Sequence, residues 1–217
     1  MHRECLPGQG WKVLESLNEV FSRHEAVLAG GTALAVQLGH RISYDLDFFT
    51  NQDFQIESVI SKIRRIENTF QIISAEEGSL IAEVGGIKVS LFKYDYEFLE
   101  KPVIYRKIRI AGIPDIASMK VIAISQRGTK RDFVDLFVIL QKMPFHKIAD
   151  HMMRRFGKER VNPVHIGKSL VYFSDADSDP EPAYLENRKI KWEKIKSFFR
   201  GHVKQFVLDL ERAGKDY

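Results

Sequence analysis

The sequence contains a single cysteine, Cys5, among 217 residues, which excludes an internal disulfide framework and suggests a reducing compartment. It lacks any apolar run approaching the ~18 residues of a membrane span, and residues 1–10 contain no apolar stretch of signal-peptide length. The net charge is also small, since 33 Lys and Arg residues are nearly balanced by 29 Asp and Glu residues. These absences predict a cytoplasmic protein that does not associate with a membrane.

The residues that are present are those of an ordinary globular protein. Hydrophobic residues make up 44% of the chain and charged residues 29%, and the length suits one large domain or two small ones. Residues 1–145 are electrically neutral, so residues 146–217 carry the whole net charge of +4. A basic C-terminal third suits contact with nucleic-acid phosphates, although solvated helix faces explain four charges equally well.

Hydrophobic periodicity predicts an α/β (α+β) fold in two parts. Residues 1–112 are expected to form a mixed or antiparallel sheet with flanking helices, and residues 113–217 a helical domain. The expected strands are residues 26–29, 45–49, 70–73, 80–84, 87–94 and a short edge strand at 108–110. The expected helices are residues 11–21, 32–38, 54–66, 115–126, 131–141 and 190–210, with an exposed loop at 174–182.

Two adjacent glycines, Gly30 and Gly31, precede the helical pattern that starts at Thr32. Because glycines carry no Cβ, their backbone N–H groups can approach a phosphate closely. The Thr32 hydroxyl could cap the helix or hold a phosphate oxygen, and the helix N-terminus adds partial positive charge. The turn is therefore a candidate triphosphate site, although a Gly-Gly pair is most often only a turn.

Asp45 and Asp47 lie two residues apart in a predicted strand, so both carboxylates project from one face, roughly 6.5–7 Å apart along it. Mg²⁺ or Mn²⁺ can lie between such carboxylates, with substrate phosphates supplying further oxygen ligands. An Asp-x-Asp sequence alone is common. Together with the Gly-Gly turn, within eighteen residues from Gly30 to Asp47, it predicts a metal-dependent nucleotidyltransferase.

A second group of charged residues follows between Lys120 and Asp135. Asp132 and Asp135 share a helix face, because they are three residues apart. Lys120 could neutralise charge developing on a triphosphate, and either aspartate could act as general base or orient Arg127 or Arg131. Spacing alone favours a simpler interpretation, in which two helices pack through Arg–Asp pairs and Lys120 is solvated.

The chain resembles the AbiEii/AbiGii family of nucleotidyltransferase-like toxins in three stretches: GGTAL at 30–34, HRISYDLDFF at 40–49 and DIASMKVIAISQRGTKRDFVDLF at 115–137. The Arg-x-Ser-x-Asp-x-Asp run at 41–47 is the most specific part. Family members accompany abortive phage infection and toxin–antitoxin pairs in bacteria and archaea. The resemblance implies a polymerase-beta-like nucleotidyltransferase fold and a cognate antitoxin as partner.

The resemblance also implies roles for residues of the first half. Gly30, Gly31 and Thr32 match the family's nucleotide-binding turn, and Asp45 and Asp47 match its metal-binding pair. Family members studied as enzymes use a nucleoside triphosphate (NTP) and Mg²⁺, and some resemble transferases that add nucleotides to the tRNA 3′ end. The implied function is a toxin that blocks translation by modifying RNA, with the tRNA 3′ end as the expected acceptor.

Further positions follow from the same comparison. Arg41 and Ser43 belong to the first motif and are assigned to nucleotide binding, with Arg41 bracing a carboxylate or touching phosphate. Lys120 matches the family lysine that is thought to contact the nucleotide phosphates. Asp132 and Asp135 match two downstream aspartates, one of which is regarded as catalytic.

One departure concerns the third carboxylate that nucleotidyltransferases often place on a later strand of the sheet. In the predicted strand over residues 86–92, Ser90 occupies the position where that carboxylate is expected. Serine is a poor Mg²⁺ ligand, so the site is expected to hold one metal rather than two. Two alternatives stay open: a non-catalytic nucleotide- or partner-binding protein, and a transferase that modifies a protein or small-molecule hydroxyl.

Overall fold

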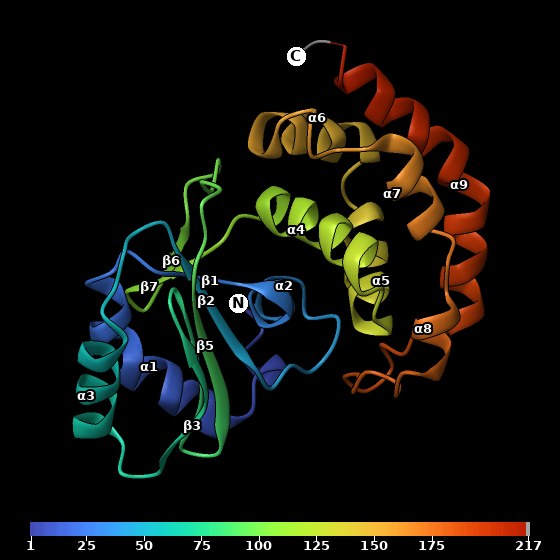
Figure 1. The fold of residues 1–217 in the computed structure, drawn as a ribbon. Helices are drawn as coiled ribbons and strands as arrows, with labels where there is room; N and C mark the ends of the chain where they lie inside the picture. Colours follow the sequence, from blue (N-terminus) through green and yellow to red (C-terminus); the bar gives the residue numbers. More distant parts are fainter. Residues whose placement is uncertain (216–217) are drawn as a thin grey trace. The chain divides into compact units, whose positions relative to one another are not determined.

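The computed structural model describes residues 1–215 of the chain (Figure 1). The chain divides into two compact units, Met1–Gly112 and a second that begins at Ile113. The first contains a seven-stranded mixed sheet with flanking helices, and the described part of the second is helical. This confirms the predicted fold class. Within the described residues, no helix combines the length and apolarity needed to cross a bilayer.

The first unit is built around one sheet, whose strand order is β3-β4-β5-β2-β1-β7-β6. Its strands are β1 (Val27–Ala29), β2 (Leu46–Thr50), β3 (Phe70–Glu76), β4 (Ser79–Val84), β5 (Ile87–Lys93), β6 (Val103–Tyr105) and β7 (Ile108–Ile110). Its helices are η1 (Arg3–Cys5, a 3-10 turn), α1 (Gly8–Ser22), α2 (Gly30–Leu38) and α3 (Ile56–Ile66). The predicted antiparallel meander is confirmed as β3-β4-β5, and β5 continues the sheet by pairing in parallel with β2.

The predicted edge position of the strand at 108–110 is wrong. β7 pairs in parallel with β1 and antiparallel with β6, so it is an inner strand. The edge is β6, a three-residue strand in which the side chains of Val103 and Ile104 are exposed. No strand was predicted over residues 103–105, and for that reason the strand at 108–110 was expected at the edge.

The two faces of the sheet differ in what covers them. On one face Leu46 and Phe48 are buried beneath α1 and α3, and the ring of Phe21 from α1 lies 4.4 Å from that of Phe48 between centroids. Asp47 and Phe49 project from the opposite face and are only partly buried. α2 lies on this second side of the sheet (Figure 1). The alternation of β2 therefore separates the core from the acidic face.

The second unit packs its helices around an aromatic core. Its helices are α4 (Ile113–Gln126), α5 (Lys130–Leu140), α6 (Phe145–Phe156), α7 (Pro163–Ser169), α8 (Ser174–Ser178) and α9 (Trp192–Ala213). α9 runs along α6 and α7 (Figure 1). The buried rings of Phe133 and Phe199 lie 5.4 Å apart between centroids, and Trp192 contacts Phe133 at 5.8 Å. The aromatic residues of α9 thus serve the core.

The prediction of an exposed loop over residues 174–182 is wrong in part. Ser174–Ser178 form α8, and Ala176 is fully buried. Asp179 then accepts hydrogen bonds at the start of α5, from the backbone N–H of Lys130 to Oδ2 (2.8 Å) and from Lys130 Nζ to the carbonyl (2.7 Å). These tertiary contacts fix a segment that shows no apolar periodicity in the sequence.

Candidate active site

β2 carries the two predicted metal-binding carboxylates. Asp45 immediately precedes the strand and Asp47 is its second residue. In the sheet, Asp47 lies between Ala29 of β1 and Ser90 of β5 as their register partner. The side chains of both aspartates are partly exposed. Asp47 therefore projects from the face of the sheet opposite α1 and α3, and Asp45 lies two residues before it.

Gly30 lies directly against Asp47. Its φ is +66°, a left-handed conformation that side chains disfavour. A Cβ at this position would lie 3.1 Å from Asp47 Oδ2. The glycine is therefore required twice, by the backbone turn into α2 and by the approach of the carboxylate. The structure thus brings the predicted glycine turn and the predicted carboxylate together. Gly31 lies in the first turn of α2.

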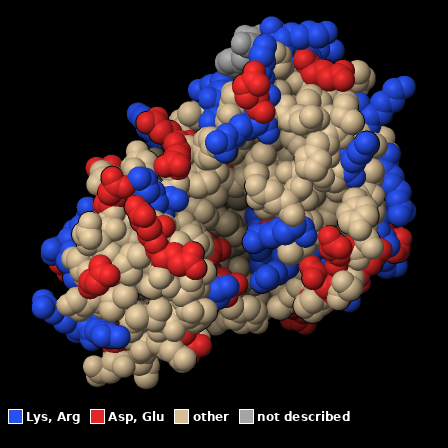
Figure 2. Space-filling model, viewed as in Figure 1, with Lys and Arg blue, Asp and Glu red and all other residues tan. Residues whose placement is uncertain are grey.

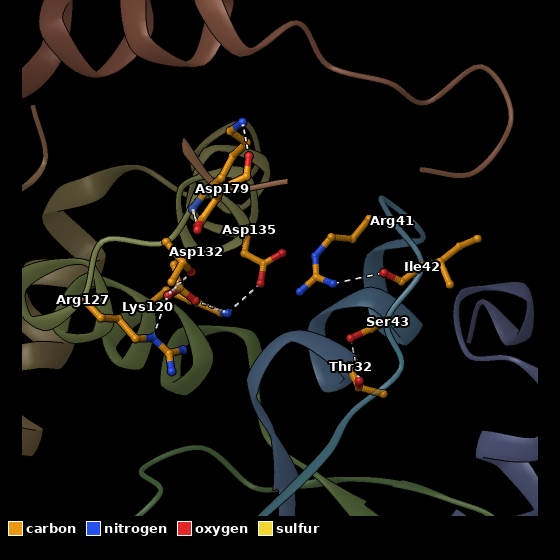
Figure 3. A network of polar contacts seen from close by, with 11 residues as sticks. Thr32, Arg41, Ile42, Ser43, Lys120, Arg127, Asp132, Asp135 and Asp179 are labelled. Carbon is orange, nitrogen blue, oxygen red and sulfur yellow. Dashed lines mark hydrogen bonds and ion pairs between the residues drawn. The ribbon is translucent and has the colours of Figure 1, made fainter. Parts of the chain in front are cut away.

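Thr32 is engaged with the protein itself. Its hydroxyl does not cap α2, so the predicted capping role is wrong. Thr32 and Ser43 are both buried, and their hydroxyl oxygens lie 2.7 Å apart (Figure 3). The Thr32 hydroxyl also donates to the backbone carbonyl of Asp45. Thr32 therefore ties the loop that leads into β2 to the first turn of α2 and fixes the backbone of Asp45.

Arg41 lies in this same loop and is 3% exposed. Its Nη1 donates to the carbonyl of Ile42 at 3.1 Å (Figure 3). The neighbouring backbone is also held, because the N–H of Ser43 donates to the carbonyl of Cys5 at 2.8 Å. The loop between α2 and β2 is thus a hydrogen-bonded segment in which Arg41 and Ser43 are buried and Tyr44 is exposed, and it presents Asp45 from a fixed backbone.

Ser90 of β5 is the register partner of Asp47 and is buried. No group of three or more His, Cys, Asp or Glu side chains placed to hold a metal occurs in residues 1–215. The metal donors predicted from the sequence are two carboxylates, Asp45 and Asp47. Mg²⁺ is commonly bound by one or two carboxylates, with water and substrate phosphates completing its shell. The residues present therefore fit a metal that arrives with a nucleotide.

In the second unit, Lys120 is part of a buried ionic network rather than solvated (Figure 3). Its Nζ lies 2.7 Å from Asp132 Oδ1 and 2.7 Å from Asp135 Oδ2. The exposed fractions of these side chains are 7% for Lys120, 2% for Asp132 and 0% for Asp135. The lysine and both aspartates singled out from the sequence are therefore in direct contact, with Lys120 on α4 and the aspartates on α5.

The second oxygen of Asp132 is engaged as well. Oδ2 accepts hydrogen bonds from Thr129 Oγ1 at 2.8 Å and from Arg127 Nε at 3.1 Å. Burial acts to raise the pKa of Asp132, but the charges of Lys120 and Arg127 outweigh it, so the pKa lies below the ordinary 3.8. An ionised carboxylate with both oxygens occupied is a poor general base. Asp132 is thus an organiser of the cations around it.

Thr129 was not predicted as a site residue, and Arg127 was predicted only as a cation that an aspartate orients. The contact from Arg127 to Asp132 confirms that orientation. The signal for Thr129 is its position at the N-cap of α5, three residues before Asp132, a spacing close to that of a capping box.

Comparison with known proteins gives concordant results. A family model described as "Nucleotidyl transferase AbiEii toxin, Type IV TA system" matches residues 12–212. The uncharacterized protein aq_aa25 of Aquifex aeolicus (strain VF5) is 38% identical over 206 residues, covering 89% of this chain and 95% of that protein.

Two solved structures share the fold. JHP933 from Helicobacter pylori has a TM-score of 0.55 at 18% identity, covering 99% of this chain and 94% of its own. MenT4, the nucleotidyltransferase toxin Rv2826c from Mycobacterium tuberculosis H37Rv, has a TM-score of 0.52 at 15% identity, covering 97% and 92%. At these identities the likeness concerns the fold.

Replacing Gly30 by alanine should destabilise the protein by about 1–2 kcal/mol, because the residue has positive φ and the new Cβ meets Asp47. Urea denaturation measures the change. Gly8→Ala is the matched control, since a Cβ at Gly8 has open space and the residue begins α1. Equal stability of the Gly30→Ala and Gly8→Ala proteins would contradict this packing.

Asp132→Asn should lower the free energy of unfolding at pH 7 by about 3 kcal/mol, because it leaves Lys120 with one carboxylate. The pKa of Asp132 is depressed by folding, so its stabilisation is present above pH 3.8 and lost as the pH falls below that value. The difference between wild type and variant should therefore shrink in acid. Urea midpoints from pH 7 to pH 3 measure it, with Asp150→Asn on the exposed face of α6 as control. A constant difference over this range would contradict the assignment.

Proposed function

The chain belongs to the AbiEii family of nucleotidyltransferase toxins, and on that premise we propose that it transfers a nucleotide from an NTP to RNA with the help of Mg²⁺. The proposed acceptor is the 3′ end of tRNA, where an added nucleotide would stop translation. Because the family model describes a type IV toxin–antitoxin system, we further propose that a separate antitoxin protein opposes this activity.

The observation that carries the proposal is the acidic face of the first unit. Asp47 is partly exposed there, and Gly30 lies against its carboxylate at the start of α2. A divalent ion held by Asp45 and Asp47 would neutralise charge on the triphosphate oxygens. The backbone N–H groups of the first turn of α2, beside the glycines, are suited to the phosphate tail. The nucleotide and the two carboxylates would then meet at the N-terminal end of β2.

The second unit supplies the other proposed catalytic groups. Lys120 is held by two carboxylates, so its ammonium group has a fixed position from which to stabilise a pyrophosphate leaving group. Asp135, which also contacts Lys120, is proposed to assist the attacking hydroxyl, as the resemblance to the family implies. Arg41 and Ser43 are proposed to act indirectly, by fixing the loop that presents Asp45.

An RNA acceptor is supported by the charge of the second unit. Lys and Arg side chains gather along α9 at the margin of the molecule (Figure 2). The exposed basic residues of this helix are Lys194, Arg200, Lys204 and Arg212. Such cations bind a phosphate backbone without regard to sequence, which suits a protein that holds a structured RNA while its end is modified.

Asp47→Asn should reduce nucleotide transfer by at least roughly a hundredfold while leaving the fold intact, because it removes one proposed metal ligand and relieves like-charge repulsion with Asp45. The assay supplies Mg²⁺, each α-labelled NTP in turn and total bacterial RNA. The matched control is Asp53→Asn, a change at an exposed aspartate paired with Lys93.

Label on tRNA-sized RNA that is lost in Asp47→Asn and kept in Asp53→Asn is the expected result. Undiminished transfer by Asp47→Asn would contradict the role of this carboxylate. Label on a protein or a small molecule, with none on RNA, would contradict the proposed acceptor and assign the enzyme to another hydroxyl.

A further inference from the structure

Two phenylalanine rings lie on the acidic face of the sheet beside Asp47. Phe49 follows Asp47 by two residues on β2, and Phe92 follows Ser90 by two residues on β5. Because Asp47 pairs with Ser90 and Phe49 pairs with Phe92, all four side chains project from the same face. The centroids of the two rings are 5.5 Å apart. The ring pair therefore lies one strand repeat, roughly 6.5–7 Å, beyond the proposed metal ligand.

The ring of Phe49 is held by two neighbours. Besides Phe92, the ring of Tyr94 lies 5.4 Å from it between centroids, with 71° between the ring planes. Tyr94 directly follows β5, and its backbone N–H donates to the carbonyl of Thr50 at 2.7 Å. Edge-to-face contacts of this kind stabilise one orientation of an aromatic side chain. The rings thus form a cluster with a defined geometry rather than a set of isolated side chains.

This cluster differs from the aromatic residues on the other face of the sheet. Phe48, the neighbour of Phe49 in the chain, is 2% exposed, and Phe21 beside it is 1% exposed, so these rings are closed to water. Phe49 and Phe92 are only partly buried and retain surface for a ligand. Contact between apolar rings and water is unfavourable, so a flat ligand that covers them gains hydrophobic free energy as well as stacking.

The two rings and the glycine turn lie on opposite sides of Asp47 along β2. On β1, Ala29 pairs with Asp47 and is followed by Gly30, whereas Phe49 pairs with Val27, two residues earlier. Phosphates bound at the turn would therefore lie on one side of the carboxylate, and the rings lie on the other. The attacking and leaving oxygens of a phosphoryl transfer are roughly in line. An acceptor nucleotide would thus approach from the side of the rings, opposite the leaving pyrophosphate.

We propose that Phe49 and Phe92 form a stacking platform for a nucleobase, and that this base is the terminal base of the RNA acceptor. The inference rests on the proposed function and adds a substrate-binding site to it. Every nucleobase has a π face, so aromatic side chains stack on bases with little regard to sequence. A phenylalanine ring has no hydrogen-bonding atom with which to read the edge of a base. Exchange of the terminal base for another base should consequently matter less than its removal.

The test compares two 5′-labelled RNA oligonucleotides that differ only at the 3′ nucleotide, which is intact in one and abasic in the other. Fluorescence anisotropy measures their affinities for the full chain in the presence of Mg²⁺ and a non-hydrolysable NTP analogue. Wild type should bind the intact oligonucleotide about tenfold more tightly, which lies within the contribution of one stacked base. Phosphate contacts are common to both oligonucleotides and cancel from this ratio of affinities.

Phe49→Leu and Phe92→Leu should each reduce the ratio to about twofold, because leucine is apolar but offers no π face. Phe70→Leu is the matched control, at a partly exposed phenylalanine of β3, and should keep the wild-type ratio. The Tm of every variant is measured alongside. An unchanged ratio in both platform variants, or equal affinity of wild type for the two oligonucleotides, would overturn the platform. A lower Tm with an unchanged ratio would assign the rings to packing alone.

A second arm separates the two nucleotides of the reaction. Without RNA, the affinity for the NTP analogue is compared with the affinity for inorganic tripolyphosphate. We expect both affinities of Phe49→Leu to equal those of wild type. Weaker binding of the analogue alone, with the oligonucleotide ratio unchanged, would place the incoming base on the rings and overturn the assignment to the acceptor.

The outcome is separable from that of the proposed function. A preference for the intact 3′ nucleotide that depends on Phe49 and Phe92, without any nucleotide transfer, would support the platform and contradict the transferase. Transfer to RNA by wild type, together with equal affinity for the two oligonucleotides, would do the reverse.

Discussion

The pairing of β2 with β1 and β5 is the constraint on which the chemistry of the first unit depends. Because side chains alternate along a strand, one register buries Leu46 and Phe48 in the core and presents Asp47 on the opposite face. A slip of one residue would bury the carboxylate and expose the two apolar side chains. The same register sets Asp47 beside Ser90 and next to the turn at Gly30. Core packing therefore fixes the position of the proposed metal ligand.

The second unit holds charged groups in fixed positions away from water. A buried charge is tolerated only when its hydrogen-bonding capacity is filled, and removal of one partner is costly. Asp132 meets this condition with Lys120, Thr129 and Arg127, and Asp135 adds a second carboxylate one helical turn later. The spacing of the two aspartates thus follows from the need to face α4 together. Arg127 extends the same network to the surface.

Local patterns were sufficient to predict most of the first unit. Alternation located the meander, and the helix expected over residues 32–38 ends where predicted, at Gly39 with φ of 69°. Features that depend on distant contacts were not predictable. Asp115 and Arg155 form a buried contact between α4 and α6, with Arg155 Nη1 donating to the Asp115 carbonyl at 2.9 Å, yet they are 40 residues apart. Likewise, the sequence offers no sign that the Thr32 hydroxyl is used inside the protein.

The most direct test is the affinity for Mn²⁺, measured by electron paramagnetic resonance with and without a non-hydrolysable NTP analogue. Two carboxylates without a third should hold the ion weakly alone and at least tenfold more tightly with the analogue, because phosphate oxygens complete the shell. Asp47→Asn should abolish this gain. Tight binding without nucleotide, or a gain that Asp47→Asn leaves unchanged, would contradict a metal site built on Asp45 and Asp47.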